Sequence, residues 1–314
     1  MSQGKTRISK AEYGSDVVVD MLKAYGVEYV ALNPGATFRG LQDSIVNYGG
    51  NKNPEVIEVC HEEIAVAISH GYYKAKGKPM AVLAHDTVGL LHASMAMFNA
   101  WCDNVPVLVM GGTGPMDITK RRPWIDWIHT GLLQGNLVRE YVKWDDQPAS
   151  VSSFPETIMR GYRSAMIEPK GPVYLCFDAE LQEQKLAEPM TIPKVELYPI
   201  PSPIQGDFEA MNKAARLLVE ATNPVILADA VGRNPDAVHS LVELAETLSA
   251  PVLDLGTRLN FIRTHPLDLT GSELTKDADL ILALDPFDLY GAISSTDRQT
   301  RKSKPLIRED AKVI

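Results

Sequence analysis

The sequence contains few cysteines, and they lie far apart along the chain. The three of them, Cys60, Cys102 and Cys176, include no C-x-x-C pair. Disulfide frameworks and structural zinc sites both need groups of closely spaced cysteines, so the sequence indicates neither. We expect all three thiols to be reduced and buried.

Long apolar runs are absent as well. No stretch approaches the ~18 to 20 uninterrupted apolar residues that a membrane-spanning helix needs. The first residues, MSQGKTRISKAEYGSD, lack the apolar core of a signal peptide. We therefore expect a cytoplasmic protein with no membrane partner. Its 314 residues, 45% of them hydrophobic and 23% charged, are typical of a soluble protein with two domains of ordinary size.

The chain also lacks the excess of positive charge that nucleic-acid-binding proteins usually carry. Its formal net charge is -9, so nucleic acid is not the expected partner. The G-x-G-x-x-G fingerprint of dinucleotide-binding sites is missing, because Gly232 stands alone after its predicted strand. These absences favour chemistry on a small molecule and disfavour a NAD-dependent dehydrogenase.

The chain does contain a regular alternation of short β-rich runs and helical patterns. Ser9 and Glu12 have the S-x-x-E form of a capping box and predict a first helix over about 10–25. The alternation that follows predicts an α/β fold with a mostly parallel sheet flanked by helices. The predicted strands are EYVALN, EVIEVC, MAVLAH, PVLVMGG and GPVYLCF, and the predicted helices cover 38–47, 61–75, 89–101 and 155–169.

A proline-rich segment divides the chain into two predicted domains. Residues 188–207 contain five prolines and little helical periodicity, which is typical of an extended linker. We place one α/β domain in residues 1–187. Residues 208–314 repeat the alternation and form a second α/β domain, whose completeness is left open. Its predicted elements are the strands NPVILADAVG, APVLDLG and ADLILALDP and a helix over about 235–248.

Side chains with useful chemistry lie where three of the predicted strands end. Pro34, Gly35 and Ala36 follow the first strand, Glu62 follows the second, and His85 ends the third. Open parallel sheets bind ligands at the carboxyl ends of their strands, and neighbouring strands are only about 5 Å apart. We therefore expect these segments to line one cleft.

Each of these residues also has a purely structural interpretation. Glu62 and Glu63 stand where a helix begins, and the unpaired amides and dipole of a helix N-terminus favour carboxylates. Asp86 is expected to cap the helix that follows His85. Gly35 alone indicates only a turn or a close backbone approach. Taken one at a time, the residues leave both interpretations open.

Taken together, two segments resemble a known enzyme group. NPGATFRGLQDSI and VCHEEIAVAISHGYYKAKGKPMAVLAHDTVGLLHASMAMFNAW are similar to the pyrimidine-binding domain of thiamine-diphosphate enzymes of the acetolactate synthase and benzoylformate decarboxylase group. The similarity covers about 10–180, and 205–293 resembles that group's central domain. It implies thiamine diphosphate as the cofactor, with Glu62 as the glutamate that contacts its aminopyrimidine. A carboxyl group there favours the imino tautomer, whose nitrogen can remove the thiazolium C2 proton.

The end of the third strand distinguishes branches of this group. Acetolactate synthases typically have an S-G-P-G-like turn there, whereas AHDTVG resembles the decarboxylase pattern and places its active-site histidine on His85. Such an imidazole delivers or accepts protons as 2-oxo acid adducts form and decay. The resemblance implies a lyase, decarboxylase or carboligase acting on a 2-oxo acid or 2-hydroxyacyl compound, with the loop Pro34, Gly35 and Ala36 beside the cofactor.

Other positions in that loop affect the expected substrate. Thr37 and Arg39 are further polar candidates for the cleft. Ala36 stands where benzoylformate decarboxylase has serine, so an aromatic 2-oxo acid is not implied.

One part of the family pattern does not occur in these residues. The family holds the diphosphate through Mg²⁺ with a G-D-G segment and a later asparagine in a third domain, and the only Gly-Asp pair here is Gly206-Asp207 in the linker. We therefore expect a hetero-oligomer in which a second subunit carries that domain and the Mg²⁺ ligands, and no metal site in this chain. Two alternatives to this hetero-oligomer stay open: a fragment of an acetolactate synthase-like large subunit, and a catalytically silent regulatory or binding homologue. A further alternative is that the central domain binds a nucleotide.

Overall fold

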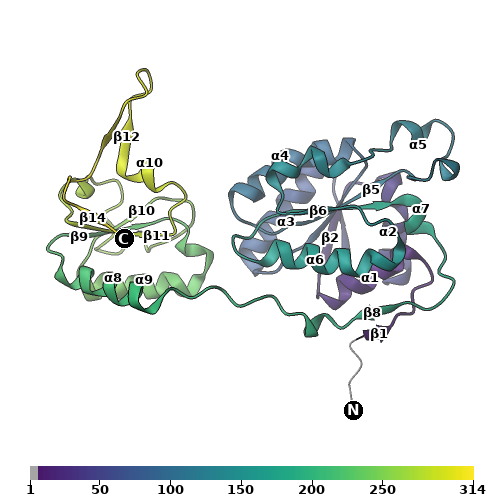
Figure 1. The fold of residues 1–314 in the computed structure, drawn as a ribbon, viewed down its shortest axis with the longest axis horizontal. Helices are drawn as coiled ribbons and strands as arrows, with labels where there is room; N and C mark the ends of the chain where they lie inside the picture. The colour runs from purple at the N-terminus through teal and green to yellow at the C-terminus, as the bar shows by residue number, and fades with distance from the viewer. Residues whose placement is uncertain (1–5) are drawn as a thin grey trace, which may run out of the picture. The chain divides into compact units, whose positions relative to one another are not determined.

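The computed structural model describes residues 6–314 and divides into two compact units. Unit 1 extends to Pro203, and unit 2 covers Ile204–Ile314. Each unit contains its own parallel sheet flanked by helices (Figure 1). The predicted fold class, α/β with two mostly parallel sheets, is confirmed.

The main sheet of unit 1 has six parallel strands in the order β3-β2-β4-β5-β7-β6. All five strands predicted from apolar runs are present, and the last of them rejoins the same sheet beside β5. The strands are β2 (Tyr29–Leu32), β3 (Glu55–Glu58), β4 (Ala81–Ala84), β5 (Leu108–Thr113), β6 (Asp145–Asp146) and β7 (Val173–Asp178).

Helices cover both faces of this sheet, with α3 and α4 on one face and α1 and α6 on the other. The helices are α1 (Gly14–Ala24), α2 (Arg39–Asp43), α3 (Glu62–Lys76), α4 (Val88–Cys102), α5 (Ile125–Ile128), α6 (Phe154–Met166) and α7 (Ala179–Glu183), and a π-helical turn over Ser44–Tyr48 continues α2. Within residues 6–314, no helix has the length and apolar character needed to cross a membrane.

Successive residues of a central strand belong to different cores, because side chains alternate along a strand. In β7, Leu175 packs in the core beneath α1 and α6, whereas Tyr174 and Cys176 pack in the core beneath α3 and α4. All three side chains are buried. Burial on both faces explains why these strands are continuous apolar runs rather than alternating ones.

The start of α1 differs from the prediction. The helix begins at Gly14 rather than near residue 10, and Ser9 does not cap it, because Ser9 Oγ donates to Asp20 Oδ2 at 2.6 Å. The N-cap is Tyr13, and Asp16 lies three residues after it, as Glu12 does after Ser9. Asp16 Oδ2 accepts the backbone N–H of Tyr13 at 3.0 Å, so a carboxylate inside the first turn pairs with the N-cap amide, four residues later than the S-x-x-E pattern predicts.

Part of the proline-rich segment is built into unit 1. Thr191–Pro193 form β8, which pairs antiparallel with β1 (Thr6–Ile8). Ile192 is fully buried in the same core as α1 and α6. A strand anchored by one buried side chain therefore lies inside the segment expected to be an extended linker.

Unit 2 has a four-stranded parallel sheet in the order β10-β9-β11-β14. The sequence predicted α9 and the strands β9, β10 and β11 of this unit. It did not predict α8, the short strand β14 or the β12–β13 hairpin. The strands are β9 (Pro224–Ala228), β10 (Val252–Asp254), β11 (Leu280–Leu284), β12 (Ser294–Thr296), β13 (Ser303–Pro305) and β14 (Lys312–Val313), and the helices are α8 (Phe208–Glu220), α9 (Pro235–Leu248) and α10 (Leu289–Ile293).

The cysteines follow the prediction only in part. All three are free thiols, and Cys176 is buried in β7. Cys60 is exposed and Cys102 is only half-buried, so the expectation of burial is wrong for both residues. Cys60 lies in the turn between β3 and α3.

Candidate active site

The candidate residues lie at the carboxyl ends of three neighbouring strands. Because β2 pairs in parallel with both β3 and β4, the segments that follow these strands leave the sheet at one edge. Glu62 is the first residue of α3, and His85 follows β4 directly. A Cβ atom placed on Gly89, in the first turn of α4, would lie 3.0 Å from Glu62 Oε1 and 3.0 Å from His85 Cβ. The two side chains therefore flank Gly89, as the strand order predicts.

Glu62 is a buried carboxyl group, with 4% of the residue exposed. Asn33 Nδ2 donates to its Oε1 at 3.2 Å, and His92 Nδ1 lies 3.3 Å from its Oε2. No lysine or arginine within residues 6–314 forms an ion pair with it. Its position at the start of α3 adds the favourable field of the helix N-terminus. The carboxyl group thus has a polar neighbour at each oxygen and no strong ionic partner.

Two further histidines surround Glu62, and sequence analysis singled out neither. His61 is the N-cap of α3, where its Nδ1 accepts the backbone N–H of Glu63 at 3.2 Å. Its ring stacks on that of His92 with 4.7 Å between the centroids. Among the described residues, His61, Glu62 and His92 form the one group that could hold a metal ion, since their ligand atoms lie within 4.8 Å of one another. A metal there would compete with any other partner of the Glu62 carboxyl.

His85 is half-buried and is held by the loop that follows β2. Thr37 Oγ1 lies 2.9 Å from His85 Nδ1. Gly35 approaches the ring so closely that a Cβ atom on it would lie 2.7 Å from His85 Cβ and 2.9 Å from Cγ. The backbone of Gly35 has φ -151° and ψ 140°, which any residue adopts, so the close contact and not the backbone requires a glycine.

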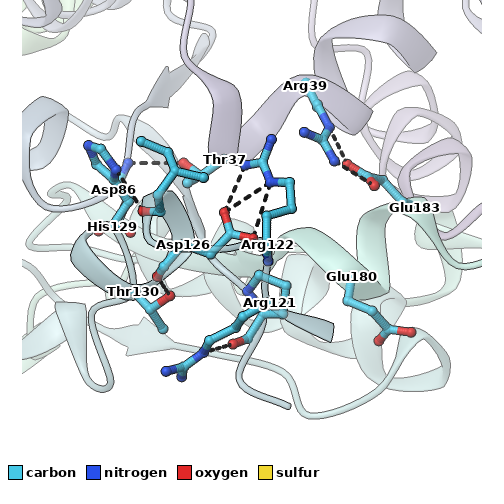
Figure 2. A network of polar contacts seen from close by, with 12 residues as sticks. Thr37, Arg39, Asp86, Arg121, Arg122, Asp126, His129, Thr130, Glu180 and Glu183 are labelled. Carbon is cyan, nitrogen blue, oxygen red and sulfur yellow. Dashed lines mark hydrogen bonds and ion pairs between the residues drawn. The ribbon is translucent and has the colours of Figure 1, made fainter. Parts of the chain in front are cut away.

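The remaining candidate residues of the loop are exposed. Pro34 and Ala36 are exposed, and Ala36 opens the short 3₁₀ turn Ala36–Phe38 that carries Thr37. Arg39 forms a bidentate pair with Glu183 of α7 on the exposed surface (Figure 2). The structure therefore assigns Arg39 to the surface.

The surroundings of His85 favour its neutral form. Burial lowers the pKa of His85, and His129, whose ring centroid is 5.2 Å away, lowers it further, while Glu62 acts in the opposite direction. The imidazole is therefore mostly uncharged near pH 7. A neutral imidazole carries one N–H donor and one acceptor nitrogen.

Asp86 is a fully buried carboxyl group next to His85. Its Oδ1 accepts the Thr87 hydroxyl, whereas its Oδ2 has no hydrogen-bond partner within residues 6–314. Burial raises the pKa of Asp86 to about 6. The N-cap of α4 is Thr87, so the expectation that Asp86 caps this helix is wrong. Figure 2 shows Asp86 in the same part of the polar network as Thr37 and His129.

Two protein-family models match the sequence. Residues 13–138 match the model described as thiamine pyrophosphate enzyme, N-terminal TPP binding domain. Residues 211–314 match the model described as thiamine pyrophosphate enzyme, central domain. The first match contains every candidate residue of the site, and the second lies within unit 2.

Individual relatives belong to the same group. The acetolactate synthase large subunit of Haemophilus influenzae is 25% identical over 240 residues, which are 76% of this chain and 40% of that protein. Benzoylformate decarboxylase of Pseudomonas aeruginosa is 25% identical over 281 residues, or 84% of this chain and 50% of that protein. The crystal structure of benzoylformate decarboxylase from Polynucleobacter necessarius shares the fold, with a TM-score of 0.78 at 22% identity over 96% of this chain and 55% of that one. The chain thus spans about half the length of the curated relatives it matches.

Gly35→Ala is predicted to displace the His85 ring, because the new methyl group would lie 2.7 Å from His85 Cβ. Overpacking of this kind lowers the free energy of unfolding by about 1–3 kcal/mol, which urea denaturation measures. The NMR signals of His85 should also shift. Gly71→Ala is the control, since its Cβ would meet open space in α3, and alanine there should be neutral or stabilising. Equal stability of the two variants, with His85 signals unmoved, would show that the contact is not tight.

Asp86→Asn is predicted to change the pH dependence of stability. Because the pKa of Asp86 is about 6 when folded and 3.8 in its reference state, the folded chain binds more protons between these values. The contribution of Asp86 to stability therefore falls as pH rises through this window, and the advantage of Asp86→Asn over wild type should grow and level off above it. Asp43→Asn, at an exposed position, should follow the wild-type profile. A pH-independent advantage for Asp86→Asn would mean that the buried carboxyl does not titrate there.

Proposed function

The chain belongs to the thiamine pyrophosphate enzyme family, and from that premise we propose that unit 1 is the pyrimidine-binding half of an active site that makes or breaks a carbon–carbon bond. The substrate would be a 2-oxo acid or a 2-hydroxyacyl compound. The observation that carries the proposal is the placement of Glu62 and His85 on two sides of Gly89, at the carboxyl edge of the sheet. A helix cap or a structural histidine alone would not need this pairing.

The surroundings of Glu62 fit an aminopyrimidine ring. Its contacts with Asn33 and His92 are long, at 3.2 and 3.3 Å, so the carboxyl can form a new hydrogen bond without breaking a pair with lysine or arginine. Gly89 approaches Oε1 so closely that a Cβ atom on it would lie 3.0 Å away, so any side chain at this position would crowd the carboxyl group. A buried carboxyl group that faces a ring nitrogen is placed to share a proton with it.

Each residue of the site would have a separate task. Thiamine diphosphate, when bound, supplies a thiazolium carbon that adds to a carbonyl group and accepts the resulting electron density. Glu62 would hold the proton at the aminopyrimidine nitrogen. His85 would form a hydrogen bond with a substrate oxygen, and Gly35 would keep its ring in place. Pro34 and Ala36, which are exposed, would form the rim of the cleft.

We infer further that a second chain carries the diphosphate-binding domain and the Mg²⁺ ligands. Residues 1–314 contain no G-D-G segment. An exposed apolar row runs along α4, in which Leu91, Met95 and Phe98 are 53%, 55% and 44% exposed. These residues recur at helical spacing, and contiguous exposed apolar rows mark interaction surfaces. His92, which contacts Glu62, is on the same helix, so a partner docked on this row would lie next to the site.

Glu62→Gln is predicted to lower kcat of the complex by at least about 100-fold, because glutamine cannot exchange a proton with the ring nitrogen. The assay combines this chain, a protein with the G-D-G domain, Mg²⁺, thiamine diphosphate and a 2-oxo acid. Glu63→Gln, at the exposed next position, is the matched control and should keep wild-type activity. Undiminished turnover of Glu62→Gln would rule out the cofactor role. No turnover with any partner would favour a catalytically silent homologue.

Met95→Glu is predicted to weaken association with the partner by about tenfold or more, because it places a charge in an apolar contact. Calorimetric titration measures the affinity, and circular dichroism checks that the fold is unchanged. Val219→Glu replaces another exposed apolar residue, 78% exposed in α8, and should bind normally. Wild-type affinity of Met95→Glu would exclude α4 as the docking face. Tight binding of thiamine diphosphate by this chain alone, with the diphosphate ordered, would exclude the second chain.

A further inference from the structure

The hydrogen bond between Thr37 and His85 has a direction that follows from the other partner of Thr37. Thr37 is buried, with 2% exposed, and its Oγ1 has two polar neighbours. It accepts the backbone N–H of Asp86 at 3.0 Å, and it lies 2.9 Å from His85 Nδ1. Because the Asp86 amide can only donate, it occupies a lone pair of the hydroxyl oxygen. The hydroxyl hydrogen is then left to find an acceptor.

Within residues 6–314, that hydrogen has one acceptor, His85 Nδ1. In the opposite arrangement, Nδ1–H of His85 would donate to Thr37, and the hydroxyl would accept two hydrogen bonds. Its own hydrogen would then be buried without a partner, which native structures avoid. The favoured arrangement has Thr37 donating to an unprotonated Nδ1.

We propose that Thr37 is a positioning residue that holds the neutral His85 ring in the Nε2–H tautomer. A neutral imidazole has one ring proton, so a ring that accepts at Nδ1 must carry its proton on Nε2. Gly35 supports this arrangement, because a Cβ atom there would lie 3.1 Å from His85 Nδ1 and would crowd the same side of the ring. The Asp86 amide in turn sets the rotation of the Thr37 hydroxyl.

The tautomer determines what His85 offers a substrate. With Nδ1 engaged by Thr37, the free nitrogen is Nε2, and it presents a hydrogen-bond donor. His85 would therefore select an oxygen of the substrate, a carbonyl or carboxylate oxygen, rather than a hydroxyl that needs an acceptor. This consequence rests on the proposed function, whereas the tautomer itself does not.

The tautomer is measured on the chain alone by long-range ¹H–¹⁵N NMR of the histidine rings, above the pH at which His85 is protonated. The chain has seven histidines, so the signals of His85 are those that disappear in His85→Gln. We expect an unprotonated Nδ1 and a protonated Nε2. A protonated Nδ1 in the wild-type chain would overturn the proposal, and no variant of Thr37 is needed for this result.

Two variants test the part played by Thr37. Thr37→Val keeps the shape but removes the hydroxyl, and the ratio of Nε2–H to Nδ1–H tautomers should fall by about fivefold, as expected for the loss of one hydrogen bond. Thr37→Ser restores the hydroxyl and should restore the ratio. An unchanged ratio in Thr37→Val, or no rescue by serine, would remove Thr37 from the role. A confirmed tautomer in a chain that never gives turnover would refute the proposed function and leave this inference intact.

Discussion

The parallel alignment of β2, β3 and β4 is the constraint on which the rest of the site depends. Parallel strands of one sheet end at the same edge, so residues that follow separate strands meet there although they are far apart in sequence. Burial fixes the register of β2 and β4, because a slip by one residue would turn every side chain of a strand to the other face. Glu62 and His85 both lie against Gly89, where a Cβ atom would be 3.0 Å from each of them.

Buried polar groups add a second level of order to this frame. The Asp86 amide, the Thr37 hydroxyl and the His85 ring form a short chain of hydrogen bonds at the end of β4. Beside it, Asp86 Oδ2 is buried without a partner in the described part of the chain, and Glu62 is buried with only long contacts. Buried polar groups are normally paired. The unpaired oxygen of Asp86 is an exception of the kind that is typical of a site that binds or converts a ligand.

The sheet of unit 1 was predictable because strands buried on both faces read as continuous apolar runs bounded by turns. Glu62 and His85 were chosen as candidates by position and resemblance together, since a glutamate at a helix start or a histidine at a strand end has an equally good structural explanation. The contact of His92 with Glu62 could not be predicted, because it depends on how α4 rotates and packs against α3. The same holds for the exposure of Cys60. Such features come from packing between distant segments, which local periodicity does not encode.

The most direct measurement is an experimental structure of this chain with its partner, Mg²⁺ and thiamine diphosphate bound. The decisive quantity is the distance between a carboxyl oxygen of Glu62 and the aminopyrimidine ring nitrogen. We predict a hydrogen bond of about 3 Å, with His85 facing the thiazolium side of the cofactor. An aminopyrimidine bound elsewhere, with Glu62 still in contact only with Asn33 and His92, would contradict the assignment of this edge of the sheet as the active site.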